Sequence, residues 1–229
     1  MAETTQVIER DHNQVVVERA QDFWSRYSRP ILIASAAIIL LCGAYFAYKY
    51  LVKGPQEEKA SEAIFKAEEY YRADSLNMAL NGDGMNAGFL RIIDKYSGTK
   101  AGNLAKFYAG SIYLKQGDFN KATKHLKDFS SDSKMIQARG YKLLGDAYAE
   151  SGKNSDALDA YKKAAHHFTE DDMNSSEYLF IAAYFADRVM KNQKAATDLF
   201  KELKEKYPRT EKGFEADKFL AQLGVYKED

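Results

Sequence analysis

The chain has 229 residues and a formal net charge of zero, from 33 basic and 33 acidic side chains. Nucleic-acid binding depends on a surplus of cationic side chains that neutralise phosphates, so this balance argues against nucleic acid as a partner. The single cysteine, Cys42, excludes an intramolecular disulfide and a thiolate metal cluster.

The N-terminal tail, residues 1–29, carries an amphipathic pattern over residues 14–28. Apolar residues recur there at helical spacing opposite Arg19 and Arg26, namely Val16, Ala20, Phe23, Trp24 and Tyr27. Such a helix would lie in the membrane interface with its apolar face toward the lipid. A disordered tail is the alternative that the sequence leaves open.

Residues 30–52 are predicted to be a transmembrane helix. Ile31 to Tyr48 is an uncharged apolar run, and 18 or more such residues indicate a membrane span. A cleaved secretory signal is not expected, because 30 residues precede the run. Aromatic residues flank the run, as they do where rings settle at lipid headgroups: Trp24, Tyr27, Tyr45, Tyr48 and Tyr50.

The charges that flank the span do not determine its orientation. Arg19, Arg26 and Arg29 precede the span, and Lys49, Lys53 and Lys59 follow it. The positive-inside comparison is therefore a tie.

The span offers one face of small residues and one cysteine. Ala36, Gly43 and Ala47 are seven and four residues apart, which places them on one side of a helix where a partner helix can pack closely. We predict these three residues as the transmembrane partner face. Cys42 is either an inert membrane cysteine or a lipidation site, and bulky Leu41 before it favours the inert cysteine.

The region from residue 53 to residue 229 is predicted to be an all-α repeat domain. Its apolar residues follow a helical period, and Gly110 and Gly145 stand 35 residues apart in matching sequence frames. Each frame continues to a glycine turn, at Gly117 or Gly152, and then to a second helix. This is the pattern of tetratricopeptide repeats, which are helical hairpins of about 34 residues.

We expect four hairpins, at about 57–98, 100–131, 135–168 and 175–208, and a capping helix at 211–223. Small residues are expected where paired helices cross, and aromatic residues around each crossing. The predicted packing residues are Gly110, Tyr113, Ala122, Tyr141, Gly145, Tyr148, Ala157, Tyr161, Ala196 and Phe200.

Two further local signals bear on the hairpin ends. Asn174 and Glu177 have the spacing of a capping box, which predicts a helix start at Asn174. The segment Tyr96–Gly102 resembles Tyr207–Gly213 in sequence, and each leads into a new helix. The fold class predicted is therefore one transmembrane helix followed by a helical-hairpin solenoid with a C-terminal cap.

Few residues suggest chemistry, and we predict no enzyme activity, no metal site and no cofactor. His166 and His167 are adjacent and point in different directions, which suits a helix C-terminus better than a metal site. His125 is expected at a surface or packing position. The loop Asn81–Asn86 has the composition of a calcium loop but lacks its closing glutamate, so a plain turn is expected.

The inner surface of the solenoid, formed by the first helix of each hairpin, is the expected binding face. The candidate binding residues there are Lys106, Arg139, Lys142, Asp146 and Tyr184.

A short tail, one span and tetratricopeptide-like hairpins joined by Tyr-(Ser/Pro)-x-Thr segments resemble the YfgM-type family of bacterial inner-membrane proteins, which are ancillary subunits of the SecYEG translocon. The resemblance implies a cytoplasmic N-terminus, a periplasmic repeat domain and no catalytic residues. The implied partners are a SecYEG-type translocon, a membrane-tethered periplasmic chaperone, emerging unfolded chains and the lipid bilayer.

On this interpretation the chain is a membrane-anchored interaction module that assists exported proteins or recruits chaperones. Two alternatives stay open. The first is a structural scaffold of another cell-envelope complex. The second is the opposite topology, with the repeats in the cytosol as a docking adaptor.

Overall fold

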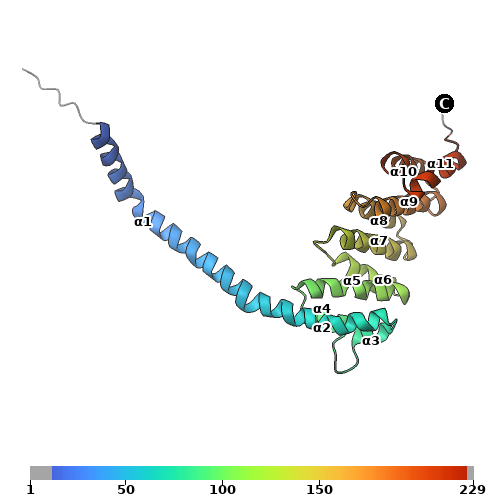
Figure 1. Ribbon diagram of the computed structural model, residues 1–229, viewed down its shortest axis with the longest axis horizontal. Coiled ribbons are helices and arrows are strands. Elements are labelled where there is room, and N and C mark those ends of the chain that lie inside the picture. Colours follow the sequence, from blue (N-terminus) through green and yellow to red (C-terminus); the bar gives the residue numbers. More distant parts are fainter. Residues whose placement is uncertain (1–11, 226–229) are drawn as a thin grey trace, which may run out of the picture. The chain divides into compact units, whose positions relative to one another are not determined.

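The computed structural model describes residues 12–225, and within that range the chain is helical apart from turns and one isolated bridge between Gly82 and Ala87. The chain forms two compact units that meet between Pro55 and Gln56. Figure 1 shows the long N-terminal helix and the stacked short helices of the second unit. The all-α fold class is confirmed.

The first unit consists of α1 (His12–Ala47) and the π-helix η1 (Tyr48–Lys53). The helical segment is long and apolar enough to cross a membrane, and none of its most apolar window is buried. A core helix of a soluble protein would be mostly buried, so full exposure is what a lipid-facing helix shows. Helix begins at His12, while residues 1–11 of the tail and the side chain of Val16 lie outside the described residues.

The π-helix has a physical cause in Pro55. Proline has no backbone N–H, so the carbonyl of Leu51 cannot receive the usual bond from four residues ahead. The turn widens before this point, and the Gly54 N–H bonds the carbonyl of Lys49, five residues back. The helical path therefore passes from the apolar run into the second unit through one widened segment.

Ten of the described helices follow η1, and together they form the repeat unit. The first four elements are α2 (Gly54–Arg72), α3 (Leu76–Asn81), α4 (Phe89–Lys95) and α5 (Lys100–Lys115). The next three are α6 (Phe119–Lys127), α7 (Lys134–Glu150) and α8 (Asn154–His167). The last three are α9 (Asp172–Arg188), α10 (Gln193–Lys206) and α11 (Glu211–Gln222).

Helices α5 and α6, α7 and α8, and α9 and α10 form antiparallel hairpins, and each hairpin contacts the next. Their buried side chains form two core clusters, one centred on α2, α4 and α5 and the other on α9 and α10. A solenoid in which each repeat contacts its neighbours is the arrangement expected of such hairpins.

Close helix crossings depend on glycine in two of the hairpins. A Cβ atom on Gly110 would lie 2.5 Å from Cγ of Leu126, and one on Gly145 would lie 2.5 Å from the Tyr161 ring. Both contacts are too short for any side chain, so the helices approach to this distance only because these two positions carry none. The partner helices present fully buried Ala122 and Ala157.

The other packing residues lie in or beside the two core clusters. Tyr113, Tyr161, Ala196 and Phe200 are buried, whereas Tyr141 and Tyr148 are half-buried. Tyr113 stacks on His125, and Tyr141 meets His167 edge to face. These side chains surround the hairpin crossings.

The start of α9 differs from the sequence-based prediction. The capping box at Asn174 and Glu177 is wrong, because α9 begins at Asp172 and is capped by Asp171, whose carboxylate accepts the Asn174 N–H at 3.1 Å. The side-chain amide of Asn174 also donates a hydrogen bond to the Asp171 carboxylate at 2.7 Å. Asp is as good an N-cap as Asn, and here it stands one turn earlier in the chain.

The two resembling segments, Tyr96–Gly102 and Tyr207–Gly213, have the same local structure. Thr99 donates its hydroxyl to the Tyr96 carbonyl at 2.7 Å and accepts the Gly102 N–H at 3.0 Å. Thr210 makes the same two bonds, at 2.9 Å to Tyr207 and 3.1 Å from Gly213. A Cβ atom on either glycine would overlap the tyrosine carbonyl oxygen. The repeated sequence is therefore a repeated helix-start motif.

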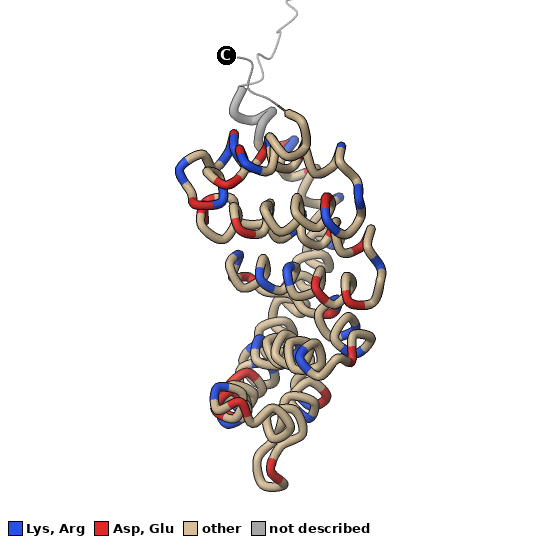
Figure 2. Tube along the Cα trace, turned by 90° about the vertical axis from the view of Figure 1, so that its right-hand side faces the viewer, with Lys and Arg blue, Asp and Glu red and all other residues tan. Residues whose placement is uncertain are grey.

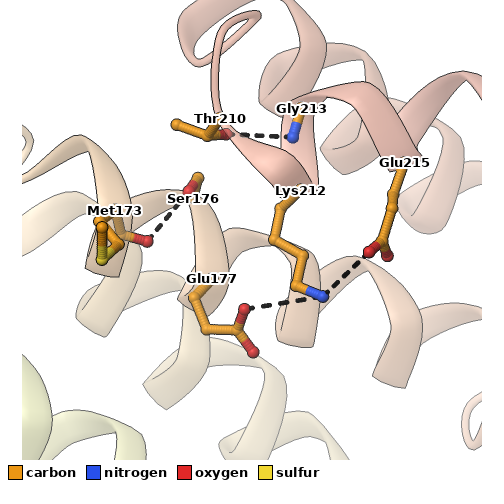
Figure 3. A network of polar contacts seen from close by, with 7 residues as sticks. All are labelled: Met173, Ser176, Glu177, Thr210, Lys212, Gly213 and Glu215. Atoms are coloured by element: carbon orange, nitrogen blue, oxygen red, sulfur yellow. Dashed lines mark hydrogen bonds and ion pairs between the residues drawn. The ribbon is translucent and has the colours of Figure 1, made fainter.

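Lys212 of the capping helix α11 contacts α9 (Figure 3). The Lys212 ammonium lies 3.2 Å from Glu215 and 3.9 Å from Glu177 of α9. It also lies 4.7 Å from the centre of the Phe180 ring, a cation–π distance. Phe219 of α11 stacks on Phe200 with ring centres 5.0 Å apart, so the apolar side of the last hairpin is covered.

We predict that replacing Gly102 with Ala lowers the free energy of unfolding by about 1–3 kcal/mol, because the added methyl group displaces the Tyr96 carbonyl. Gly98 is the matched control: it lies in the same loop, and a Cβ there meets nothing within 4 Å. Gly98→Ala should be neutral or slightly stabilising. Urea unfolding followed by circular dichroism measures both, and equal stability of the two variants would refute the motif.

Candidate protein-interaction surface

The predicted binding residues lie on the first helices α5, α7 and α9, and the structure places several of them in contacts within the chain. The ammonium of Lys106, on α5, donates a hydrogen bond to the backbone carbonyl of Asp128 at 3.1 Å. The guanidinium of Arg139 lies 5.9 Å from the centre of the Phe107 ring. The Lys106 contact lies within the α5–α6 hairpin, and the Arg139 contact joins α7 to α5 of the preceding repeat.

Lys142 and Asp146 form a pair with a third residue, Tyr161 of α8. The Lys142 ammonium lies 2.8 Å from the Asp146 carboxylate, and the Tyr161 hydroxyl donates to the same carboxylate at 3.0 Å. Burial, together with the negative charge of Asp146, raises the pKa of Tyr161 well above its usual range. This cluster joins the two helices of one hairpin.

Tyr184 is the one aromatic residue among the five candidates, and 44% of its surface is accessible to solvent. Its ring lies edge to face against Phe219 at 5.9 Å and near Phe180 at 6.1 Å, and the Arg188 guanidinium lies 5.8 Å from its centre. Tyr184 lies on α9 and Lys106 on α5, so the five candidates are distributed over three first helices.

The histidines and the Asp83 loop have structural partners. His166 lies 2.8 Å from Glu202, and burial, followed by the charge of Lys124, lowers the pKa of His125. Asp83 accepts hydrogen bonds from the Tyr70 hydroxyl and from the amides of Asn86 and Met85, which hold the pKa of its carboxyl far below the usual range. Across the described residues, no three His, Cys, Asp or Glu side chains are grouped as metal ligands.

A groove lies between α2 and α5, lined by residues that were not predicted to bind a partner. It has a volume of about 610 Å³. Its floor includes Ile64 and Leu104, and Phe65, exposed by 62%, forms its edge. Three acidic side chains line it, Glu57, Glu58 and Glu68. We call this hollow the α2–α5 groove.

A second hollow, of about 390 Å³, lies on the other side of α5, against the connection between α6 and α7. It shares Lys100 and Leu104 with the α2–α5 groove and adds Asn103, Asp132 and Ile136. We call it the Asn103 pocket. Two of their lining residues are common, and we refer to the two hollows together as the depression along α5.

Asn103 has an unusual feature for a buried amide. Its Oδ1 atom is buried and has no hydrogen-bond donor, and its Nδ2 atom lies 3.4 Å from the Ser130 hydroxyl, near the limit of a hydrogen bond. A buried acceptor without a donor costs about 1–3 kcal/mol, so such atoms are rare in folded proteins.

One signal could have indicated the depression from sequence. Phe65 interrupts the polar face of the helix that carries Glu62 and Glu69, and a large aromatic on a polar face often marks a contact. The proximity of Phe65 to Leu104 and of Asn103 to Ser130 depends on the three-dimensional packing and is not visible in a linear pattern.

Charges are interspersed over the whole repeat unit. Figure 2 shows acidic and basic residues mixed along the stacked helices, without one large patch of a single sign. The depression along α5 differs locally, because its lining residues include four carboxylates, Glu57, Glu58, Glu68 and Asp132, and one ammonium, Lys100.

The hairpin geometry agrees with the comparison with known families. The model of the tetratricopeptide repeat-like domain matches residues 21–140, just over half of the chain. The chain belongs to the tetratricopeptide repeat-like family. The match begins in α1 and ends within α7, so it includes every residue that lines the depression. Comparison with curated proteins and with solved structures found no match.

We predict that Asp146→Ala lowers the free energy of unfolding by about 1–3 kcal/mol, because it leaves the buried Tyr161 hydroxyl without an acceptor. The loss should be smaller in a Tyr161→Phe background, where no hydroxyl is left unpaired. Exposed Asp159 on α8 is the control, and Asp159→Ala should change stability by less than about 0.5 kcal/mol. Equal losses in both backgrounds would show that the bond contributes nothing.

Proposed function

We propose that the protein is a non-enzymatic, membrane-anchored module for protein–protein interaction. One observation carries the proposal: a tetratricopeptide repeat-like unit lies in the same chain as a helix that is apolar, long enough to cross a membrane and not buried. Repeat solenoids of this kind present extended surfaces that bind other proteins. An unburied apolar helix is stable in lipid rather than in water.

Tethering supplies the mechanism. A repeat unit fixed to the membrane is confined near other membrane-bound proteins, which raises its effective concentration toward them to about the millimolar range. A contact that is weak in free solution then becomes effective. The repeat unit therefore needs modest affinity only, which agrees with a depression of moderate size and mixed polarity.

The partner proposed is the bacterial Sec translocon, with the chain as an ancillary subunit that assists exported proteins or recruits a membrane-tethered chaperone. The N-terminus would then be cytoplasmic and the repeats periplasmic, in the bacterial inner membrane. The support is the sequence of elements, a tail, one span and tetratricopeptide-like hairpins, which resembles the YfgM-type family.

The small face of the span is the proposed contact with a partner helix. Ala36, Gly43 and Ala47 are exposed on α1, and a Cβ atom on Gly43 meets nothing within 4 Å. Small residues permit close backbone approach in lipid, where dispersion contacts drive association. A leucine at Gly43 would hold a partner helix away.

The test is a mild-detergent pull-down of the full-length protein from native membranes, with the co-purifying proteins identified by mass spectrometry. We expect translocon subunits and a chaperone with the intact chain, and their loss from a variant without residues 30–52. Gly43→Leu should reduce their recovery several-fold. Ala34→Leu, on the opposite side of the helix, is the matched control and should leave recovery unchanged.

The other outcomes of the pull-down are equally informative. Recovery of another envelope complex, without translocon subunits, would make the protein a scaffold of that complex. Unchanged recovery with Gly43→Leu would refute the transmembrane partner face. Protease access to the repeat unit in spheroplasts tests the proposed orientation, because a cytosolic repeat unit would be protected.

A further inference from the structure

The part of α1 that precedes the apolar run, residues 17–29, has one apolar face. Phe23, Trp24 and Tyr27 are exposed by 45–56%, and the rings of Phe23 and Tyr27 lie 4.9 Å apart on one side of the helix. A group of large exposed apolar side chains is costly in water and marks a surface that another phase or molecule covers. We call residues 17–29 the juxtamembrane segment.

Distances along the helix show that the span alone does not cover this face. The apolar run begins at Ile31, and the headgroup layer outside the hydrocarbon is about 5–8 Å thick. Trp24 lies seven residues before Ile31, which is about 10 Å along the helix axis, and Val17 lies about 21 Å away. A helix that left the membrane along the membrane normal would therefore hold most of its apolar face in water.

Pro30 marks the point at which the helix can turn. It lies inside α1, and because proline has no backbone N–H the carbonyl of Arg26 lacks its helical donor. The residue before a proline, here Arg29, also disfavours helical backbone angles. The helix is thus weakest at the boundary between the juxtamembrane segment and the span, and a bend there brings the apolar face onto the membrane surface.

The charged side chains of the segment suit a surface of lipid phosphates. Arg19 and Arg26 lie along one border of the apolar face, where the stem of an arginine stays on apolar surface while its guanidinium reaches the headgroups. Guanidinium groups bind phosphate oxygens in pairs. With Arg29, Glu18 and Asp22 included, the segment has three guanidinium groups and two carboxylates, so its net charge of +1 favours anionic phospholipids.

The membrane is also the nearest possible occupant of the apolar face. The juxtamembrane segment and the apolar run belong to one helix, α1, without a linker between them. The segment therefore stays beside the lipid surface whatever the protein partners are. Tryptophan and tyrosine, which supply two of its three large rings, are the residues that settle at lipid headgroups.

We propose that the juxtamembrane segment is a lipid-binding helix that lies in the plane of the membrane interface. Its apolar face is turned toward the acyl chains, and its three arginines bind the phosphates of anionic phospholipids. This binding goes beyond the proposed interaction module, and it requires from that proposal only that residues 30–52 span the membrane.

The experiment uses Trp24, the only tryptophan of the chain, as a fluorescent probe of the apolar face. The full-length protein is reconstituted at a low protein-to-lipid ratio in vesicles of phosphatidylcholine and phosphatidylglycerol, and acrylamide serves as the quencher in water. A Trp24→Phe, Ser25→Trp variant moves the indole by one residue, to the charged side of the helix. We expect acrylamide to quench the moved indole at least about threefold more strongly than Trp24. Lipids with brominated acyl chains should show the opposite order.

A second pair of variants tests the arginines. In vesicles with phosphatidylglycerol, an Arg26→Glu, Arg29→Glu variant should raise the acrylamide quenching of Trp24 by about twofold or more, because the carboxylates are repelled by anionic lipid. The matched control is a Lys124→Glu, Lys127→Glu variant, which makes the same change of charge at the same spacing on exposed positions of α6. This control should leave the quenching of Trp24 unchanged, and no effect of the arginine variant would overturn the assignment of the phosphates.

Two outcomes would overturn the in-plane helix itself. Equal acrylamide quenching of Trp24 and of the moved indole would show that the segment projects into water. Protection of Trp24 that disappears when the protein is diluted with lipid would show that a second copy, and not the lipid, covers the face.

The result is separable from that of the pull-down. Protection of Trp24 without translocon subunits in the pull-down supports the lipid-binding helix and refutes the translocon role. Recovery of the translocon with equal quenching at both positions supports that role and refutes the lipid-binding helix.

Discussion

The close crossing of paired helices is the constraint on which the repeat unit depends. At Gly110 and Gly145 the partner side chain occupies the space that a Cβ would need, so a larger residue at either position would force Leu126 or Tyr161 to shift. In these two hairpins the glycine of the first helix lies opposite that side chain of the second helix. The stacking of hairpins then follows from the aromatic residues around each crossing.

The same constraint bears on function, because it fixes which side of each first helix stays open. Gly110 faces α6, so other positions of α5, including Leu104 and Asn103, are left on the surface against α2 and α7. The hollows along α5 are therefore a product of hairpin packing. A repeat protein can change the residues that line such a hollow without changing the crossings that form it.

The helices and hairpins could be predicted from the sequence, because they depend on patterns among neighbouring or regularly spaced residues. The apolar period located the helices, and the 35-residue spacing of Gly110 and Gly145 located the hairpins, since both signals are local or strictly repeated. The capping box at Asn174 failed because Asp171, one turn earlier, is an equally good cap. Propensity alone cannot choose between two good caps.

The interaction surface was harder to predict, because it depends on contacts between distant residues. Lys142 and Asp146 are polar residues on a first helix, which suggested a ligand, but Tyr161 of the next helix uses the Asp146 carboxylate. Conversely, nothing in the linear pattern around Asn103 indicates that the packing buries its Oδ1 atom. Which polar groups are satisfied is decided by the tertiary structure.

The π-helix at Tyr48–Lys53 joins the apolar helix to the repeats, and Pro55 explains why the widened turn is there. This continuity of backbone hydrogen bonding suits a segment that leaves a membrane, since unpaired backbone groups are costly in lipid. Anchoring and binding thus belong to one continuous helical chain.

The accessibility of Cys42 in native membranes tests the membrane anchor most directly. Cys42 is the only cysteine of the chain and lies within the apolar run. A polar maleimide should not label it in intact membranes but should label it after denaturation in detergent. The positive control is a Cys42→Ala, Ser155→Cys variant, whose single thiol lies at an exposed position of α8. The maleimide should label this thiol without denaturation once the reagent can reach the side of the membrane that holds the repeat unit. Equal labelling of Cys42 before and after denaturation would contradict a membrane-spanning anchor.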